Sequence, residues 1–186
     1  MLFRSNKYKE VIDLIKLSKF NDVITILLSN KNQCVNDPIF YNLLGFAYDS
    51  ISKTSDAKKN YLKSLELDSS FYEARFNLAV LNYKTHNYTE AEELFNQLIK
   101  IYKDDYNSYY NLGIIKFELK QYDLAINFFK IACSYNPNFY GAYNHLAKAY
   151  EELQKYDYAI FYYEKANSVN SEDLNLSFNL KVGDIL

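Results

Sequence analysis

Residues 106–139 read YNSYYNLGIIKFELKQYDLAINFFKIACSYNPNF, and this stretch decides the fold. It contains two segments, Ser108–Lys120 and Tyr122–Tyr135, whose apolar residues recur at the spacing of one helix face. Pro137 ends the second segment, because proline lacks a backbone N–H and disfavours α geometry at the residue before it. The stretch therefore predicts a helix pair. A single pair of this size is too small to bury its own apolar face, so it needs similar pairs beside it.

The same pattern recurs along the chain at a step of 34 residues. Three features repeat: a Leu followed by Gly or Ala, an Ala early in the second segment, and an aromatic ring four residues later. The residues are Leu44–Gly45, Leu78–Ala79, Leu112–Gly113 and Leu146–Ala147; Ala57, Ala91, Ala125 and Ala159; and Tyr61, Phe95, Phe129 and Tyr163. A small residue lets two helix axes approach closely, and a ring from the partner helix fills the groove between them. The recurrence predicts an array of helix pairs.

At these positions the sequence resembles the tetratricopeptide repeat family, whose 34-residue unit is a helix–turn–helix with Leu-Gly in its first helix and a closing Pro. The resemblance assigns repeats to residues 38–71, 72–105, 106–139 and 140–173 of a single domain, 1–186. It implies an all-α fold, a right-handed α-solenoid of antiparallel helix pairs with about 11 helices. The departures are Ser69, Lys103 and Ser171 in place of the closing Pro, and Arg75 at a usually aromatic position. They weaken single turns and leave the assignment intact.

The two ends of the chain depart further from the repeat. Residues 4–37 keep two helical segments but lack the small residues, and are interpreted as a degenerate first repeat that caps the array. Residues 174–186 begin as another first helix, although Lys181 stands where Gly or Ala is expected. Three interpretations of this segment stay open: a capping helix, a surface for homodimer formation, or the start of a further repeat or domain.

The composition argues against several functions. With 21 basic and 23 acidic residues the net charge is −2, whereas nucleic-acid or membrane-surface binding needs a basic excess. The 20 Tyr and 13 Phe are assigned mainly to core packing, since the repeat positions use many of them. Cys34 and Cys133 lie in different repeats and lack metal-ligand spacing, so neither a disulfide nor a metal site is expected. No apolar run approaches the ~20 residues of a membrane span, and no secretory signal is recognisable, so a cytoplasmic protein is expected.

No catalytic constellation is recognisable in the sequence. His86 and His145 have no carboxylate or cysteine neighbours at ligand spacing, and none of the Gly lies in a phosphate-binding loop. An enzyme is therefore not expected, and neither a cofactor nor a metal is implied.

One face of each first helix lies roughly opposite the face that packs inward, and it carries candidate binding residues. In the family that the sequence resembles, this face lines a concave groove that binds an extended peptide or a partner helix. The candidates are Phe76, Val80, Tyr83, Lys84, Tyr110, Ile114, Phe117, Asn144 and Lys148. An exposed apolar stripe commonly marks a binding site. The alternative is that the aromatic members pack sideways against adjacent first helices.

A polar register runs along the same face at the 34-residue step: Asn77, Asn111, His145 and Asn179. An amide can donate to and accept from a peptide backbone, so this register predicts a sequence-independent grip on an extended chain. It is similar to the asparagine ladder in the repeat superhelix of O-GlcNAc transferase, although His145 interrupts it. Because the chain contains 21 Asn, composition alone is the alternative explanation.

These observations predict a non-catalytic module that binds a peptide segment of a partner protein in its groove. The alternative is the substrate-recruiting region of a larger transferase, of the glycosyltransferase, sulfotransferase or methyltransferase type, to which such arrays are often joined. Reading the coding sequence beyond Leu186 distinguishes them, because a stop codon there removes the alternative.

Overall fold

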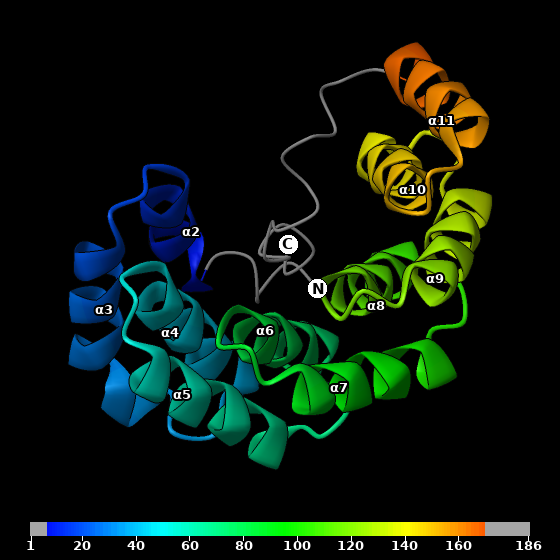
Figure 1. Cartoon of the computed structure of the whole chain (residues 1–186). Helices are drawn as coiled ribbons and strands as arrows, with labels where there is room; N and C mark the ends of the chain where they lie inside the picture. The colour runs from blue at the N-terminus through cyan, green and yellow to red at the C-terminus, as the bar shows by residue number, and fades with distance from the viewer. Residues whose placement is uncertain (1–6, 170–186) are drawn as a thin grey trace. The chain divides into compact units, whose positions relative to one another are not determined.

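The computed structural model describes residues 7–169, and the regular elements in this range are all helical. Its ten α-helices are α2 (Lys9–Lys16), α3 (Phe20–Ser29), α4 (Pro38–Ser50), α5 (Thr54–Leu67), α6 (Tyr72–Lys84), α7 (Tyr88–Ile101), α8 (Tyr106–Glu118), α9 (Tyr122–Tyr135), α10 (Tyr140–Glu152) and α11 (Tyr156–Ser168). A short 3-10 helix, Lys31–Gln33, follows α3 (Figure 1). From α4 onward, first and second helices each start at steps of 34 residues. The expected all-α solenoid class of antiparallel helix pairs is confirmed.

The described residues form two compact units, 7–81 and 82–169, and the boundary falls within α6. In the first unit α2 packs on α3, α3 on α4, and α4 on α5. In the second unit α8 pairs with α9 and α10 with α11, while α7 also packs on α8 and α9 on α10 (Figure 1). A second helix such as α9 therefore contacts both its own first helix and the next one. This arrangement buries the core as a strip between successive pairs.

The predicted contact between a small residue and a ring is present in the structure. A Cβ atom added to Gly113 would lie 2.5 Å from Cε1 of Phe129, and one added to Gly45 would lie 2.8 Å from Cδ1 of Tyr61. Both rings are fully buried. Glycine at these two positions is therefore required by the close approach of the paired helices and by the ring that fills the space.

The turn inside each helix pair has a feature that the sequence pattern does not predict. Five residues at steps of 34 adopt the left-handed conformation, with φ between 55° and 61°: Ser18, Ser52, His86, Lys120 and Gln154. At Lys120 the turn is closed by N–H of Lys120 donating to the carbonyl of Phe117 and by N–H of Gln121 donating to that of Lys116, both at 2.8 Å. This is a Schellman cap, whose left-handed position is usually glycine. Since Ser18 obeys the same step, α2 and α3 share the turn of the later pairs.

Replacing Lys120 by Gly is expected to raise the free energy of unfolding by about 0.5–1 kcal/mol. A side chain disfavours the left-handed conformation, so glycine removes this strain from the folded chain. The stabilisation exceeds the entropic cost of ordering glycine, which is more flexible in the unfolded chain. Gln121→Gly is the matched control, because Gln121 has φ −88° and gains nothing from glycine. Chemical denaturation of both variants measures the effect. Equal or lower stability of the Lys120 variant would contradict it.

Three second helices, α5, α7 and α9, end at the same register, although proline follows only α9. As predicted, α9 ends before Pro137, with Asn136 in an extended conformation. α5 ends at the equivalent residue although Ser69 replaces the proline. Both ends share another device: the side chain of Asp68 accepts from N–H of Ser70 at 2.9 Å, and that of Asn136 accepts from N–H of Asn138 at 3.1 Å. These turns hold the chain away from helical geometry without proline.

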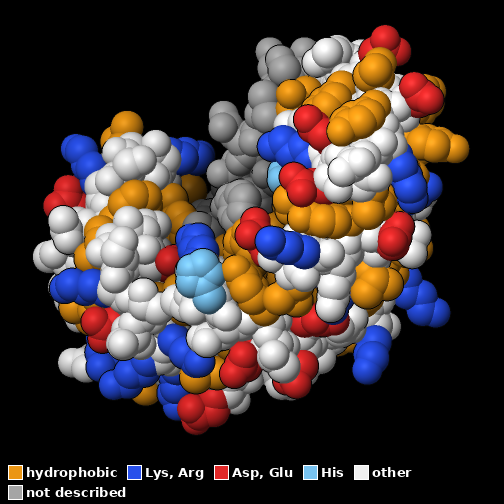
Figure 2. Space-filling view, in the orientation of Figure 1, with side chains coloured by type: hydrophobic (Ala, Val, Ile, Leu, Met, Phe, Trp, Pro, Cys, Tyr) orange, Lys and Arg blue, Asp and Glu red, His pale blue; other side chains and the backbone are white. Residues whose placement is uncertain are grey.

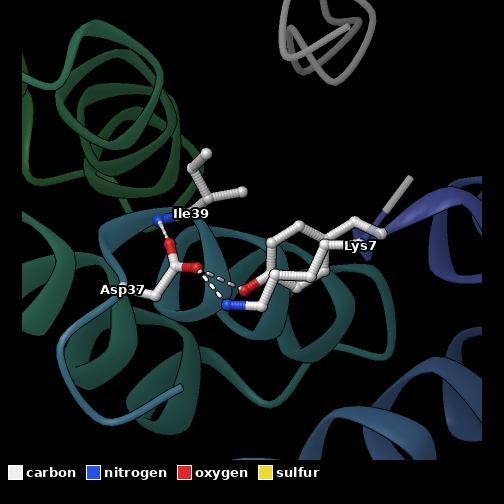
Figure 3. A network of polar contacts seen from close by, with 4 residues as sticks. Lys7, Asp37 and Ile39 are labelled. Carbon is white, nitrogen blue, oxygen red and sulfur yellow. Dashed lines mark hydrogen bonds and ion pairs between the residues drawn. The ribbon is translucent and has the colours of Figure 1, made fainter. Parts of the chain in front are cut away.

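A polar network joins the N-terminal helix pair to α4 (Figure 3). Asp37 caps α4, because its Oδ1 accepts from N–H of Ile39 at 3.0 Å. Its Oδ2 accepts from Nζ of Lys7 at 2.7 Å and from the buried hydroxyl of Tyr8 at 2.8 Å. Burial acts to raise the pKa of Asp37, but the bonds from Lys7 and Tyr8 outweigh it, and the net shift of the pKa is downward. Asp37 is therefore held as a carboxylate.

The side of α11 that faces away from α10 is largely uncovered within the part of the chain that the structure describes. Four large apolar side chains of α11 are exposed, Tyr156, Tyr158, Ile160 and Phe161, and Figure 2 shows hydrophobic side chains at the surface over this helix. Ile126, one repeat before Ile160, is buried in the core that α9 and α10 share. The predictions for residues 174–186, a cap, a homodimer surface or the start of a further repeat or domain, lie outside the described residues and stay predictions.

Candidate functional site

Six of the twelve predicted binding residues that the structure describes are buried: Phe76, Asn77, Val80, Tyr110, Asn111 and Ile114. The first three belong to the first unit and the other three to the second. Tyr110 shows where such a ring goes, since its centroid lies 4.8 Å from that of Phe139 and 5.7 Å from that of Phe129. It packs sideways between the first helices α8 and α10. For Tyr110, the structure therefore agrees with the alternative that the aromatic residues pack sideways against adjacent first helices.

The polar register has partners within the fold at each described position. Nδ2 of Asn77 donates to Oδ1 of Asn42 at 3.0 Å, and Nδ2 of Asn111 donates to the carbonyl of Asn107 at 2.8 Å. The buried Oδ1 of Asn77 and Nδ2 of Asn42 lack a protein partner among residues 7–169. Asn179 lies outside the described residues. These bonds supply a structural reason for the register, and the grip on a peptide backbone stays a prediction.

The remaining predicted residues are accessible, belong to the second unit and are called here the first-helix surface: Tyr83, Lys84, Phe117, Asn144, His145 and Lys148. They come from the end of α6, from α8 and from α10. The rings of Phe117 and His145 meet edge to face, with centroids 6.3 Å apart. Phe117 also meets Tyr122 of α9 edge to face at 5.3 Å. Phe117 is thus a half-buried ring held in place from two sides.

His145 is the most enclosed titratable group of this surface. Nδ1 lies 3.0 Å from the carbonyl oxygen of Gly141 and 3.1 Å from the hydroxyl of Tyr110. A carbonyl only accepts, so Nδ1 carries the proton of the neutral ring and Nε2 is left as an acceptor. Burial lowers the pKa of His145; the bond to Gly141 opposes this and the charge of Lys148 adds to it. The ring is therefore neutral at pH 7.

Two lysines carry the charge of the first-helix surface, and acidic side chains lie beside it. Lys84 and Lys148 are exposed, and Glu118 lies near Tyr83. Burial, Glu118 and Tyr88 raise the pKa of Tyr83 to about 12, so its hydroxyl stays protonated and can donate. Tyr88 and Tyr122, which open second helices, pack beside Tyr83 and Phe117. The prediction omitted both because it considered first helices alone, although their 34-residue spacing is visible in the sequence.

The described residues offer no set of groups for metal or nucleophilic chemistry. Residues 7–169 contain no cluster of three metal-binding side chains. Burial raises the pKa of the Cys133 thiol to about 12, so it is protonated and a poor nucleophile. In the same range no helix is long and apolar enough to cross a bilayer. What the arrangement offers is a rigid surface with aromatic, amide and ammonium groups.

Paired helices at a 34-residue step, with small residues facing rings and accessible groups on the first helices, define a helical-repeat scaffold for protein interactions. Family models described as tetratricopeptide repeat match residues 44–106, 106–139 and 140–173. The chain belongs to the tetratricopeptide repeat family.

Solved structures with this fold include the crystal structure of MamA, with a TM-score of 0.74 at 24% identity, covering 84% of this chain and 91% of that one. A MamA structure from Desulfovibrio magneticus RS-1 gives a TM-score of 0.77 at 17% identity, covering 89% and 94%. At these identities the likeness shows the fold alone. The uncharacterized protein ycf37 of Porphyra purpurea is 34% identical over 65 residues, which are 35% of this chain and 38% of that relative. The chain thus spans well under half the length of this relative.

Proposed function

We propose that the chain is a non-catalytic module that binds a peptide segment of a partner protein on the first-helix surface of its second unit. The observation that supports this most is Phe117. Its ring is accessible yet held between His145 and Tyr122, so a partner gains apolar contact without having to order a loose side chain. Lys84 and Lys148 add exposed ammonium groups. The fitting ligand carries an apolar side chain flanked by acidic residues.

One buried member of the predicted set, Tyr110, supports this surface from below. Tyr110 contacts the ring of His145 at a centroid distance of 5.4 Å, and its hydroxyl oxygen accepts from the protonated Nδ1. With Nδ1 engaged, Nε2 of His145 and the amide of Asn144 are the neutral polar groups through which peptide N–H and C=O groups bind. The recruiting region of a larger transferase and a cytoplasmic location stay predictions, because the described residues do not bear on them.

The test begins with selection of peptides from a random phage-displayed library on the immobilised chain. Affinities of synthesised, fluorescein-labelled winners are then measured by anisotropy. Phe117→Ala is expected to weaken binding about tenfold, the effect of losing a central anchor. Leu124→Ala is the matched control, since Leu124 is 48% exposed on α9 and lies off this surface.

The double variant Lys84→Glu, Lys148→Glu changes only exposed side chains and separates loss of binding from loss of fold. It is expected to weaken the same peptides while leaving thermal unfolding unchanged. The proposal would be overturned if the selected peptides bound Phe117→Ala and the double lysine variant as tightly as they bind the unaltered chain.

A further inference from the structure

A pocket of about 520 Å³ opens in the first unit, between α3, α4 and α5. Its floor comes from α4, through Tyr41, Leu44 and Tyr48, and one wall from α5, through Asp56, Lys59 and Asn60. Its volume falls in the range of ligand sites. Tyr41 and Leu44 are buried, while Leu28 and Leu62 at the rim are nearly half exposed. The pocket belongs to this unit alone and shares no residue with the first-helix surface.

The last repeat has the same floor but a filled space above it. Three repeats, or 102 residues, after Tyr41, Leu44 and Tyr48 stand Tyr143, Leu146 and Tyr150, so the three floor residues are identical. The α5 positions differ, because Asn60 is replaced by Tyr162 and Asp56 by Tyr158. The rings of α10 and α11 form one stack.

The geometry of this stack shows what fits over such a floor. Tyr162 lies against Tyr150 with ring centroids 5.4 Å apart and planes 2° apart, and against Tyr143 at 6.5 Å and 18°. Tyr158 also stacks on Tyr150, with centroids 5.0 Å and planes 19° apart. Nζ of Lys130, from α9, lies 5.6 Å from the centroid of Tyr150. In the first unit the short side chain of Asn60 leaves the corresponding place between Tyr41 and Tyr48 open.

The charges around the open pocket select among aromatic ligands. Lys63 is paired with Glu66 at 2.7 Å, so these two charges offset each other. Lys31 and Lys59 are exposed and have no ion-pair partner within residues 7–169, whereas Asp56 is the one acid left at the lining. Two lysines against one carboxylate favour an acidic ligand, with each exposed contact of modest strength.

We infer that the α3–α4–α5 pocket is a second docking site, which takes an aromatic side chain of a partner protein from a segment rich in acidic residues. The ring enters over Asn60 and stacks between Tyr41 and Tyr48, as Tyr162 does between Tyr143 and Tyr150. Carboxylates that flank the ring pair with Lys59 and Lys31. This inference does not depend on the proposed function of the first-helix surface.

The test uses the full chain labelled with nitrogen-15 and an acetylated, amidated hexapeptide, Asp-Glu-Tyr-Phe-Glu-Asp. Amide shifts are followed as the peptide is added. Saturable shifts are expected in α4 and α5 around Tyr48 and Asn60. Two altered peptides probe the chemistry, one with leucine for both rings and one with lysine for all acids, and both are expected to bind at least about fivefold more weakly. Equal binding of either one would overturn the inference.

Asn60→Tyr fills the pocket with the ring that the last repeat already accommodates on the same floor. It is expected to abolish the shifts, or to weaken binding by about tenfold or more. Lys59→Glu keeps the pocket open and is expected to weaken binding roughly fivefold. The matched control is Lys58→Glu, an exposed neighbour that does not line the pocket, with a change expected within about twofold. Unchanged binding by the Asn60 and Lys59 variants would show that the pocket is not the site.

Discussion

Replacing Phe129 by Ala is expected to lower the free energy of unfolding by about 3–5 kcal/mol. The ring is fully buried, and it fills the space that Gly113 leaves between α8 and α9. Its removal leaves a cavity that cannot collapse easily, because Tyr110 and His145 hold the other side of the ring at centroid distances of 5.7 and 5.6 Å. Urea denaturation followed by circular dichroism measures the loss.

Phe128→Ala is the matched control for this prediction. Phe128 precedes Phe129 on α9, has the same side chain and is only half buried. Its replacement is expected to cost about 1 kcal/mol, the transfer free energy of a partly covered ring. Equal losses for the two variants would contradict the account of how the helix pairs are held together.

Asp37→Ala is expected to lower the stability of the first unit by about 2–4 kcal/mol. The change removes the cap of α4 and leaves the buried hydroxyl of Tyr8 without its acceptor. Lys7 contributes little to this sum because its side chain is 42% exposed. Hydrogen exchange of the α2 and α4 amides measures the loss in this unit. The control is Asp37→Asn, which retains an acceptor for the cap and is expected to cost less.

The same carboxylate makes stability depend on pH. The pKa of Asp37 is lower in the folded chain than in the unfolded chain, so its contribution is present above the unfolded pKa of about 3.9 and is lost as the pH falls through the folded pKa. The stability difference between the unaltered chain and Asp37→Asn is therefore expected to shrink below about pH 4. A difference that stays constant down to pH 2 would show that Asp37 is not held as a carboxylate.

The repeat and its packing could be predicted from the sequence because both depend on residue size at fixed spacing. Gly113 and Phe129 lie on the two helices of one pair, α8 and α9. A small residue and a ring that recur at these two positions already imply their contact. The left-handed turn at Lys120 could not be predicted, because propensity rules expect glycine there. The five turns are closed by local backbone hydrogen bonds, which the pattern of side chains does not specify.

The candidate site was predicted less completely, because the exposure of a residue depends on its neighbours. Spacing places Tyr110 and Phe117 on the same face of α8, but Tyr110 meets Phe139 and His145 of the next repeat and is buried, whereas Phe117 near the helix end remains accessible. Asn77 was assigned to a ligand, yet its amide meets Asn42 one repeat earlier. In a repeat array, contacts between repeats decide which side chains a partner can reach.

Site-specific photocrosslinking tests the central claim most directly. Benzoylphenylalanine is placed at Phe117 or, as the control, at Leu124 on the outer side of α9, and each chain is irradiated with a selected peptide at saturating concentration. The account predicts a crosslinked product from position 117 and none from position 124. Crosslinking from 124 alone would show that the partner binds elsewhere and that the first-helix surface is not the binding site.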